Sequence, residues 1–466
     1  MGIGHNALNT DELRRKDSTH FLHPWQHFDT MKRDGALVIA RGEGAHVFDS
    51  DGNRYLDGIG GLWCVNVGYG REELVDAMAE QARMLPYFSA FVDTTNPPAA
   101  ELAYKLAQLA PGSINHVMFS GSGSAANDSA VRLTHYYHGR KGNPRKKHII
   151  SRKAAYHGST YLGISLGGKA SDRSEHFHYI TDFIHHISSP DVYRRPDGQT
   201  IEDFCDALVA EFDAKVAEIG ADEVGGFIAE PIMGAGGVIV PPPGYLSRIR
   251  ERCRELDILF IADEVVTAFG RLGHMFASRD EFGIEPDVIV CAKGITSGYI
   301  PLGATLFSDA VFDVISAPDP DAWFTHGYTY SGHPVACAVA LKNIEIIERE
   351  DLCGHVARVG DYLERQLRTL ADLPFVGDVR GRRFMICIEY VADKKTKELL
   401  PDELDISKRI ANACEERGLI VRPVGHLNVL SPPLILTESE VDTMVAVLRE
   451  SVLAVHDDVA ATLSAA

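Results

Sequence analysis

ILFIAD (258–263) and DVIVCAK (287–293) are the two stretches that decide the fold of this chain. Each is an apolar run that ends in one charged side chain, Asp263 in the first and Lys293 in the second. Runs that are apolar throughout are typical of strands buried on both faces, as in parallel sheets covered by helices. A lysine at the mouth of such a strand is either a cap that reaches for water or an amine held away from water.

Similar apolar runs alternate with helical patterns between about residues 100 and 305. They are HVMFS (116–120), KHIIS (147–151), GGFIAE (225–230) and GATLF (303–307). Helices between buried strands imply parallel crossovers, so this part is predicted to be a large α/β domain with a mostly parallel sheet. After residue 336, strand patterns lie between helical patterns, one of which is long and polar. This part is therefore predicted to be a smaller α+β domain.

We therefore expect a fold of the α/β class with three parts along the chain. Residues 1–70 form an N-terminal arm and part of the small domain, residues 71–335 the large ligand-binding α/β domain, and residues 336–466 the C-terminal small α+β domain. A chain of 466 residues is long enough for two such packed lobes.

The composition of the chain limits which partners and which cellular compartment are expected. A formal net charge of −19 argues against a nucleic-acid or anionic-membrane surface. The eight cysteines include no C-x-x-C pair, which indicates reduced core thiols and a cytoplasmic protein. The first 20 residues lack the apolar core of a secretory signal, and Asn6 breaks the Gly2 myristoylation pattern. No apolar run is long enough to span a membrane.

A run of small residues follows the strand at 116–120, in HVMFSGSGSAAND (116–128). Ser122, Gly123 and Ser124 stand at the expected start of a helix, where free N–H groups and the helix dipole suit a phosphate. A serine N-cap with a flexible turn explains the same stretch equally well.

Asp263 and Lys293 at neighbouring strand ends, beside such a cradle, form a more specific combination. Parallel sheets bind ligands beyond the carboxyl ends of their strands. A buried carboxylate keeps a pyridinium nitrogen protonated, and a desolvated lysine can form an imine. Both properties belong to pyridoxal 5′-phosphate (PLP) chemistry.

LFIADEVVTAFGRLG (259–273), followed by AKGITSGYIPLGA (292–304), resembles the class III aminotransferases of fold type I. The likeness runs from YLDGIGGLW (55–63) to LIVRP (419–423). GITSGYIPLGA and HGYTYSGHPVACAVAL (326–341) are most similar to the ω-amino acid or amine:pyruvate transaminases. Val266 supports that branch, because many ornithine- and GABA-type members carry Gln there.

The resemblance implies roles for individual residues. Lys293 would form the Schiff base, and Lys293, Asp263 and Tyr156 would be the catalytic residues. The cofactor-binding residues would be Ser122, Gly123, Ser124, Tyr156, His157, Glu230, Asp263, Val265, Lys293 and Thr329, with Thr329 reaching the phosphate of the opposite subunit. The substrate would be bound by Trp63, Phe91 of the partner subunit, Tyr156 and Arg422, of which Arg422 would meet a carboxylate. No metal is expected.

The implied function is a ping-pong transfer of an amino group from an amine or ω-amino acid to pyruvate or a similar keto acid. The implied assembly is a homodimer, or a dimer of dimers, with shared active sites. A PLP-dependent aminomutase and an α-ketoglutarate-using aminotransferase are the alternatives on this fold. One departure is visible, since Ala125 stands where many relatives have glutamate.

Rival classes rest on weaker patterns. GISLGGKAS (163–171) nearly matches a phosphate-binding P-loop but has Ala170 where a hydroxyl is required. The histidines at 176, 178, 185 and 186 lack the spacing and the accompanying acids of a metal site, which favours a solvated loop. A non-catalytic binding module is disfavoured by the presence of both Asp263 and Lys293.

Overall fold

The apolar runs between residues 114 and 308 form one sheet in the computed structural model, which describes residues 8–465. The strands are β4 (Ile114–Ser120), β5 (His148–Arg152), β6 (Ile184–Ile187), β7 (Val224–Ala229), β8 (Leu259–Asp263), β9 (Val288–Cys291) and β10 (Gly303–Ser308). Their spatial order is β4-β10-β9-β8-β7-β5-β6, and the stretch from β9 to β6 is parallel throughout. The α/β fold class expected from the sequence is confirmed.

Two details of this sheet differ from expectation. The strand predicted at GATLF forms β10, but it runs antiparallel to both β9 and β4, because the chain turns straight back after β9 without a crossover helix. The histidine-rich stretch, expected to be a loop, ends in the edge strand β6, which includes His185 and His186. The isoleucines at both ends of β6 are buried and anchor it beside β5.

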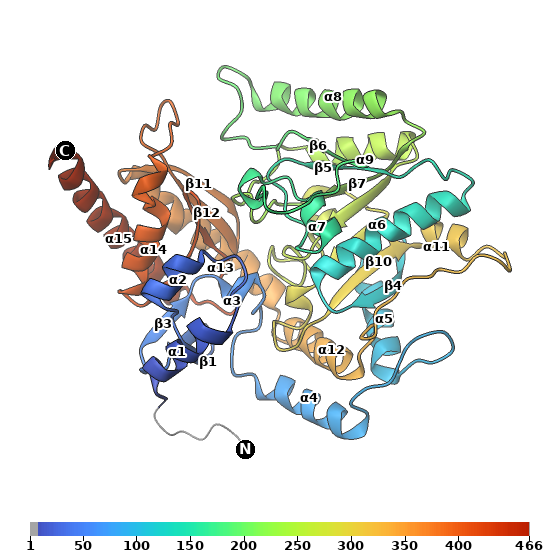
Figure 1. Ribbon diagram of the computed structural model, residues 1–466, viewed down its shortest axis with the longest axis horizontal. Helices are drawn as coiled ribbons and strands as arrows, with labels where there is room; N and C mark the ends of the chain where they lie inside the picture. The colour runs from blue at the N-terminus through green and yellow to red at the C-terminus, as the bar shows by residue number, and fades with distance from the viewer. Residues whose placement is uncertain (1–7, 466) are drawn as a thin grey trace.

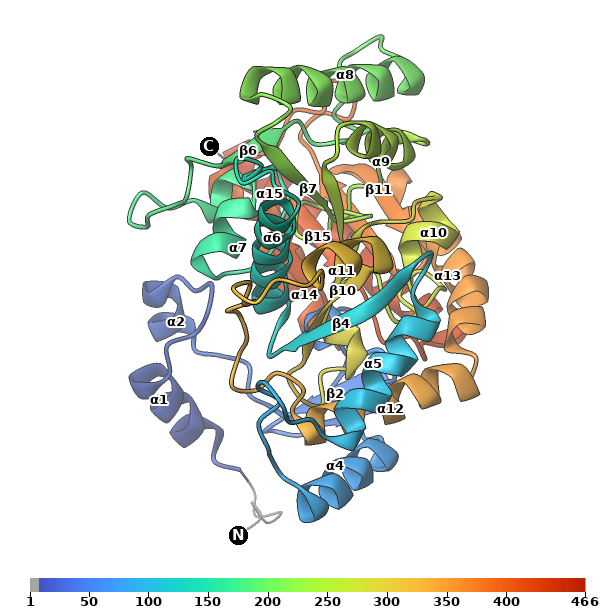
Figure 2. The same ribbon diagram turned by 90° about the vertical axis from the view of Figure 1, so that its right-hand side faces the viewer.

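Helices cover both faces of the large sheet, as Figures 1 and 2 show. The elements of this domain are α4 (Glu72–Met84), α5 (Pro97–Leu109), α6 (Gly123–Arg140), α7 (Tyr161–Leu166), η1 (Ala170–Asp172), α8 (Ile201–Ile219), α9 (Tyr245–Glu255), α10 (Ala277–Phe282), η2 (Lys293–Ile295), α11 (Asp309–Ile315) and α12 (Pro334–Arg349). One buried apolar cluster joins the sheet to α4, α5, α8, α9 and α12, and another joins it to α6, α7 and α11. The sheet is therefore buried on both sides, as its apolar sequence requires.

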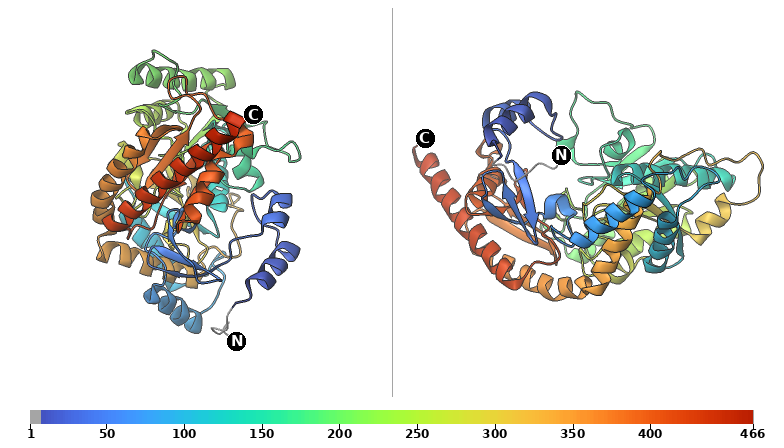
Figure 3. Two further views of the ribbon diagram at one scale, coloured as in Figure 1. Left: turned by 90° about the vertical axis from the view of Figure 1, so that its left-hand side faces the viewer. Right: turned by 90° about the horizontal axis from the view of Figure 1, so that it is seen from below.

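The small domain is formed by a second sheet, and this one is antiparallel. Its elements are α13 (Leu352–Arg368), η3 (Thr369–Asp372), β11 (Val376–Arg382), β12 (Met385–Tyr390), η4 (Asp402–Leu404), α14 (Ile406–Glu415), β14 (Arg422–Val424), β15 (Leu427–Leu430) and α15 (Glu438–Ala465). The strand order is β11-β12-β15-β14. Helices α13 and α15 lie along the outer side of this domain (Figure 3) and share one buried apolar cluster with the sheet.

The N-terminal part joins this domain through a third sheet. Its elements are α1 (Thr10–His20), α2 (Phe28–Asp34), β1 (Ile39–Glu43), β2 (His46–Asp49), β3 (Arg54–Asp57) and α3 (Gly60–Trp63), together with β13 (Leu419–Ile420). The strand order is β1-β2-β3-β13, and β13 runs parallel to β3. Strands from both ends of the chain thus share one sheet. Residues 1–7 of the expected arm, with the Gly2 position, lie outside the described residues.

All eight cysteines are free, and six of them are buried. Within residues 8–465, no helix combines the length and the apolar character that crossing a membrane demands.

Arg271 ties the two domains together from the loop after β8. It is fully buried, and its guanidinium donates to the carbonyl oxygens of Phe384 and Pro432 and to Oδ1 of Asn66. Burial lowers the pKa of Arg271 to about 10. One side chain therefore links the large domain to the N-terminal and C-terminal parts of the small domain.

Replacing Arg271 with Met should destabilise the protein by about 3 kcal/mol or more, because the acceptors that it leaves are buried without partners. Thermal and denaturant unfolding measure this loss. Arg145→Met is the matched control, since Arg145 is exposed and pairs with Asp222 at the surface, where such pairs contribute about 0–1 kcal/mol. Equal losses in the two variants would contradict the linking role of Arg271.

Candidate active site

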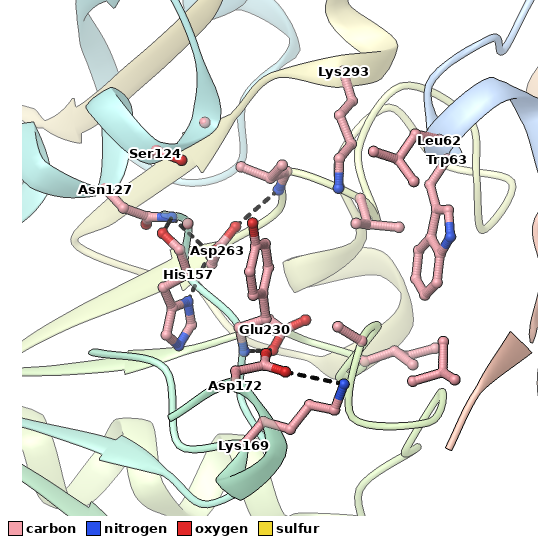
Figure 4. A pocket seen from close by; sticks show the side chains of 18 of the residues that line it. Leu62, Trp63, Ser124, Asn127, His157, Lys169, Asp172, Glu230, Asp263 and Lys293 are labelled. Atoms are coloured by element: carbon pink, nitrogen blue, oxygen red, sulfur yellow. Dashed lines mark hydrogen bonds and ion pairs between the residues drawn. The ribbon is translucent and has the colours of Figure 1, made fainter. Parts of the chain in front are cut away.

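The two charged strand ends meet in one pocket. Asp263 is the last residue of β8 and lies opposite Val290 of the parallel strand β9, while Lys293 opens η2 directly after β9. Both line a pocket of about 230 Å³ at the carboxyl ends of the strands. Figure 4 shows the amine of Lys293 pointing into this pocket, with Asp263 across from it.

Lys293 is placed in an environment that disfavours its charge. Its backbone has a positive φ of 47°, and its Nζ lies 5.8 Å from the centre of the Trp63 ring. Burial is the main reason why the pKa of Lys293 lies below its ordinary value, and the positive charge of Arg422 acts in the same direction. The negative charges of Asp263 and Glu230 oppose this shift without reversing it. The amine is therefore uncharged at a lower pH than an exposed lysine.

Asp263 is held by three donors and is only 4% exposed. Its Oδ2 accepts from Nδ1 of His157 at 2.7 Å and from Nδ2 of Asn127 at 2.8 Å, and its Oδ1 accepts from the Val265 N–H at 3.1 Å. His157 is itself buried, and Asn127 also donates to the His157 carbonyl oxygen at 3.0 Å. These three donors fix the orientation of the carboxyl group. The bottom of the pocket is a fixed acceptor for a protonated group.

The start of α6 has the open N–H groups of an anion site. The Ala125 N–H donates to Oγ of Ser122 at 3.2 Å, so Ser122 is the N-cap of this 18-residue helix. The Ser159 N–H donates to Oγ of Ser124 at 3.1 Å. The N–H groups of the first helical turn have no partner within the helix, and both serine hydroxyls keep a proton to donate. Gly123 and Ser124 line the pocket, whereas Ser122 lies just outside its lining.

Glycines bring this helix close to its neighbours. A Cβ on Gly123 would lie 3.0 Å from Cγ2 of Val265. A Cβ on Gly158, which has a φ of +119°, would lie 2.5 Å from Oγ of Ser124. The cradle beside α6 therefore depends on residues without a side chain at both positions.

Glu230 organises the opposite wall. Its Oε1 accepts from the Tyr156 N–H at 3.1 Å, and its Oε2 accepts from the Gly234 N–H at 2.7 Å. Burial is the main cause that raises the pKa of Glu230, and the negative charge of Asp263 adds to it. The carboxyl group thereby fastens the Tyr156 loop to the loop after β7.

Arg422 is a cation without a hydrogen-bond partner among the described residues. It lies in β14, lines the pocket together with Trp63 and Tyr156, and is half-buried. Burial lowers the pKa of Arg422, against the opposing influence of Tyr156 and Asp172. A guanidinium that is neither paired nor freely hydrated is a ready site for a carboxylate.

Phe91 and Thr329, expected to act on a neighbouring subunit's site, do not line the pocket of their own chain. Phe91 is 50% exposed and lies beside Gly327. Thr329 is exposed, and its carbonyl oxygen accepts from the Tyr87 hydroxyl at 2.7 Å. The two residues are thus surface features on segments that lie close together.

Several pocket residues were missed by the sequence analysis. They include Trp25, Leu62, Asn127, Lys169 and Asp172. Asn127 had a signal, since it lies four residues after Gly123 and therefore on the same face of α6. Lys169 belongs to the rejected P-loop match, which forms the end of α7 and the start of η1 rather than a strand, loop and helix, and Asp172 follows directly after it. Trp25 had no local signal.

Comparison with known proteins gives the chain a family context. Residues 29–452 match the model of the class-III aminotransferases. The putrescine–pyruvate aminotransferase of Pseudomonas aeruginosa is 43% identical over 95% of this chain and 96% of its own length. The mitochondrial γ-aminobutyrate transaminase 1 of Oryza sativa subsp. japonica is 38% identical over 94% of this chain and 85% of its own length. The crystal structure of an (S)-enantioselective ω-transaminase from Thermomicrobium roseum superposes with a TM-score of 0.93 at 40% identity, covering 97% of this chain and 99% of that one.

The buried lysine makes stability depend on pH in a predictable direction. The folded pKa of Lys293 lies below the ordinary 10.5, so between these two values the unfolded chain binds more protons and stability rises with pH. Lys293→Met removes this cost, so the cofactor-free variant should be more stable than the wild type near neutral pH. Its advantage should shrink as the pH rises towards 10.5.

Thermal unfolding across this pH range measures the difference, with Lys395→Met as a control for loss of an exposed lysine. Each unit by which the folded pKa lies below the ordinary one corresponds to about 1.4 kcal/mol. A stability gain that does not change with pH would contradict the uncharged state of Lys293.

Proposed function

The chain belongs to the class III aminotransferases, and from this premise we propose that it transfers an amino group from an amine or ω-amino acid to pyruvate or a similar keto acid. That it is an aminotransferase follows from the family and from its close relatives. The observation that carries the finer proposal is the pocket itself. Lys293 and Asp263 come to it from adjacent strand ends, and Arg422 lines it as an unpaired cation.

We further propose PLP as the cofactor, because the donors around the pocket fit each part of it. Asp263 would accept from the ring nitrogen, and Lys293 would bind the aldehyde carbon. Val265 and Tyr156 would pack against the ring, while Gly123 and Ser124, with the hydroxyl of Ser122, would hold the phosphate at the start of α6. The close approach at Gly123 and Gly158 leaves this cradle open. When bound, PLP supplies an electron sink for the carbon that loses a proton.

Lys293 would move the proton in both halves of a ping-pong reaction. Its uncharged Nζ takes the proton from the carbon that carries the donor's amino group, and the same group returns a proton to the acceptor carbon. The lowered pKa of Lys293 makes the uncharged form available at a lower pH than in an exposed lysine. His157, Asn127 and the Val265 N–H all donate to Asp263, so its carboxyl group is held in place as an acceptor for the ring nitrogen.

Arg422 and the aromatic walls would select the substrates. The guanidinium of Arg422 would bind the carboxylate of pyruvate in two-point fashion. Trp63 is buried and presents an apolar wall to donors that have no carboxylate. Because Arg422 makes no hydrogen bond to the described part of the chain, it is free to leave the pocket when such a donor binds.

We infer a homodimer, or a dimer of dimers, with shared active sites. This inference is supported by the exposure of Phe91 and Thr329 on neighbouring segments, where Tyr330 is 62% exposed as well. Phe91 would then complete the substrate pocket of the opposite subunit, and Thr329 its phosphate site. A cytoplasmic location is proposed on the free state of all eight cysteines.

Two alternatives remain on the same fold. The first is an aminotransferase that uses α-ketoglutarate; γ-aminobutyrate transaminases are among the relatives, although Val266 stands where many GABA-type members have Gln. An aminomutase would need no separate acceptor.

An assay of the purified protein supplied with PLP distinguishes the proposed function from these two alternatives. Our proposal expects that alanine forms from pyruvate with putrescine, β-alanine or an arylalkyl amine as donor. Faster turnover of α-ketoglutarate, or reaction without any acceptor, would favour the alternatives.

Lys293→Ala should lower amine-to-pyruvate transfer by about 10⁴-fold, because the proton-transferring group is lost. Alanine formation measures this, and an unchanged melting temperature shows that the variant still folds. Substantial activity in a folded Lys293→Ala protein would refute the role of this lysine.

Arg422→Ala should lower kcat/KM for pyruvate by about 10–100-fold, since a charged two-point interaction is lost. An apolar monoamine donor should be affected by less than about threefold, because it makes no ion pair with Arg422. Arg422→Lys keeps the charge without the fork, so its kcat/KM for pyruvate should lie between those of the wild type and Arg422→Ala. Equal losses for donor and acceptor would count against carboxylate binding by Arg422.

A further inference from the structure

A third carboxylate lines the pocket and has no part in the chemistry described above. Asp263 is held by three donors and Glu230 by two backbone N–H groups, whereas Asp172 faces the pocket from η1. In Figure 4, Asp172 and Lys169 lie on one side of the pocket, and Lys293 enters from the other side. A substrate that reacts at Lys293 and extends across the pocket would therefore bring its far end to Asp172.

The position of Asp172 is fixed by its backbone. Its N–H donates to the Lys169 carbonyl oxygen at 3.1 Å, and its own carbonyl oxygen accepts from the Tyr179 hydroxyl at 3.3 Å. Its side chain is only 11% exposed. The backbone of Asp172 is therefore held beside the pocket, and its largely buried carboxylate lies at the pocket wall.

The lysine partner of this carboxylate is replaceable, and Oδ1 of Asp172 also accepts from the Ser171 hydroxyl at 3.2 Å. Nζ of Lys169 lies 3.2 Å from Oδ1 of Asp172, and the Lys169 side chain is 25% exposed. An ion pair of this kind contributes about 0–1 kcal/mol, and a lysine on its flexible stem can turn its charge out to water. A ligand ammonium can therefore take the place of Lys169 at the carboxylate, with the net charge of the pair conserved.

The remaining walls suit a chain of methylene groups. Leu62, Ile232, Val266 and Val424 line the pocket, together with the rings of Trp25 and Trp63. An apolar channel with a reactive amine at one end and a carboxylate at the other matches a molecule with an amino group at each end of an alkyl chain. The same carboxylate lies close enough to Arg422 to influence its pKa, so it also acts on whatever Arg422 binds.

We propose that Asp172 sets the charge preference of the enzyme for both of its substrates. It favours donors that carry a second ammonium group, that is, diamines, and it disfavours acceptors that carry a second carboxylate. Both effects have one electrostatic cause, a fixed negative charge at the far wall. This inference rests on the proposed function, because it assumes that amine donors and keto-acid acceptors use this pocket.

Asp172→Asn in the enzyme loaded with PLP tests both effects. With pyruvate as acceptor, kcat/KM for 1,4-diaminobutane should fall about tenfold or more, while that for butylamine should change less than about twofold. With butylamine as donor, the ratio of kcat/KM for α-ketoglutarate to that for pyruvate should rise about tenfold. A purely structural role would lower all four values together and would overturn the inference.

Two further variants sharpen the test. Lys169→Met removes the competing cation, so it should lower KM for 1,4-diaminobutane and leave KM for butylamine nearly unchanged. Glu175→Gln removes a negative charge from the exposed loop three residues beyond Asp172 and outside the pocket lining, and it should alter neither ratio. A response of Glu175→Gln equal to that of Asp172→Asn would overturn the inference, because it would reflect net charge alone.

The outcome separates this inference from the proposed function. If the wild type uses butylamine and pyruvate but Asp172→Asn shifts neither ratio, the charge preference is refuted and the transaminase stands. If the wild type transfers nothing from any amine, the proposed function fails. The proposed role of Asp172 is then tested by a binding measurement. Binding of 1,4-diaminobutane, followed by the fluorescence of the tryptophans in the pocket, should then weaken about tenfold in Asp172→Asn, and unchanged binding would overturn the inference.

Discussion

The parallel register of β8 and β9 is the constraint on which the rest of the site depends. It brings Asp263 and Lys293 to the same edge of the sheet from strands that are neighbours in space. The two groups are kept chemically distinct by their surroundings: three donors hold the carboxyl group of Asp263 in place, while burial favours the uncharged amine of Lys293. A simple ion pair between them would satisfy both charges and leave no reactive group. The fold instead maintains a base and an anion on either side of one cavity.

The charged groups of the pocket differ in how firmly their surroundings hold them. The groups nearest the sheet are fixed by the backbone and by buried side chains, as the contacts of Asp263 and Glu230 show. The charges farther out, on Arg422, Lys169 and Asp172, are weakly paired or unpaired within the described chain. Rigid inner groups would suit a tightly held ring, and the side chains of Arg422 and Lys169, which can turn towards water, would suit substrates that change between the two halves of the reaction. One pocket can thus accept a cationic donor and an anionic acceptor in turn.

The sequence predicted what is encoded locally and missed what is assembled from distant segments. Apolar runs ending in Asp263 and Lys293 predicted both the strands and the meeting of their ends, because parallel strands end at one edge. Ser122 was recognisable as a helix start, and it is the N-cap of α6. The direction of β10 depends on whether the chain crosses over or turns back after η2, which apolar content does not specify.

Trp25 and Asp172 could not be found in this way. Trp25 reaches the pocket from the N-terminal arm and packs edge-on against Tyr156. The two residues are 131 positions apart, and no periodicity in the sequence predicts their contact. Asp172 lies just after the failed P-loop match, in a stretch with no pattern of its own. The roles of all the predicted site residues stay predictions, as does the domain division at residues 71 and 336.

The pairing of β3 with β13 has a consequence for how the protein is made, since the partner strand of Leu56 is synthesised about 360 residues later in the chain. At a synthesis rate of about 5–20 residues per second, the open edge of β3 stands exposed on the ribosome for tens of seconds. The first strands to emerge are therefore among the last to reach their final place, and shielding that edge is a task for whatever accompanies the nascent chain.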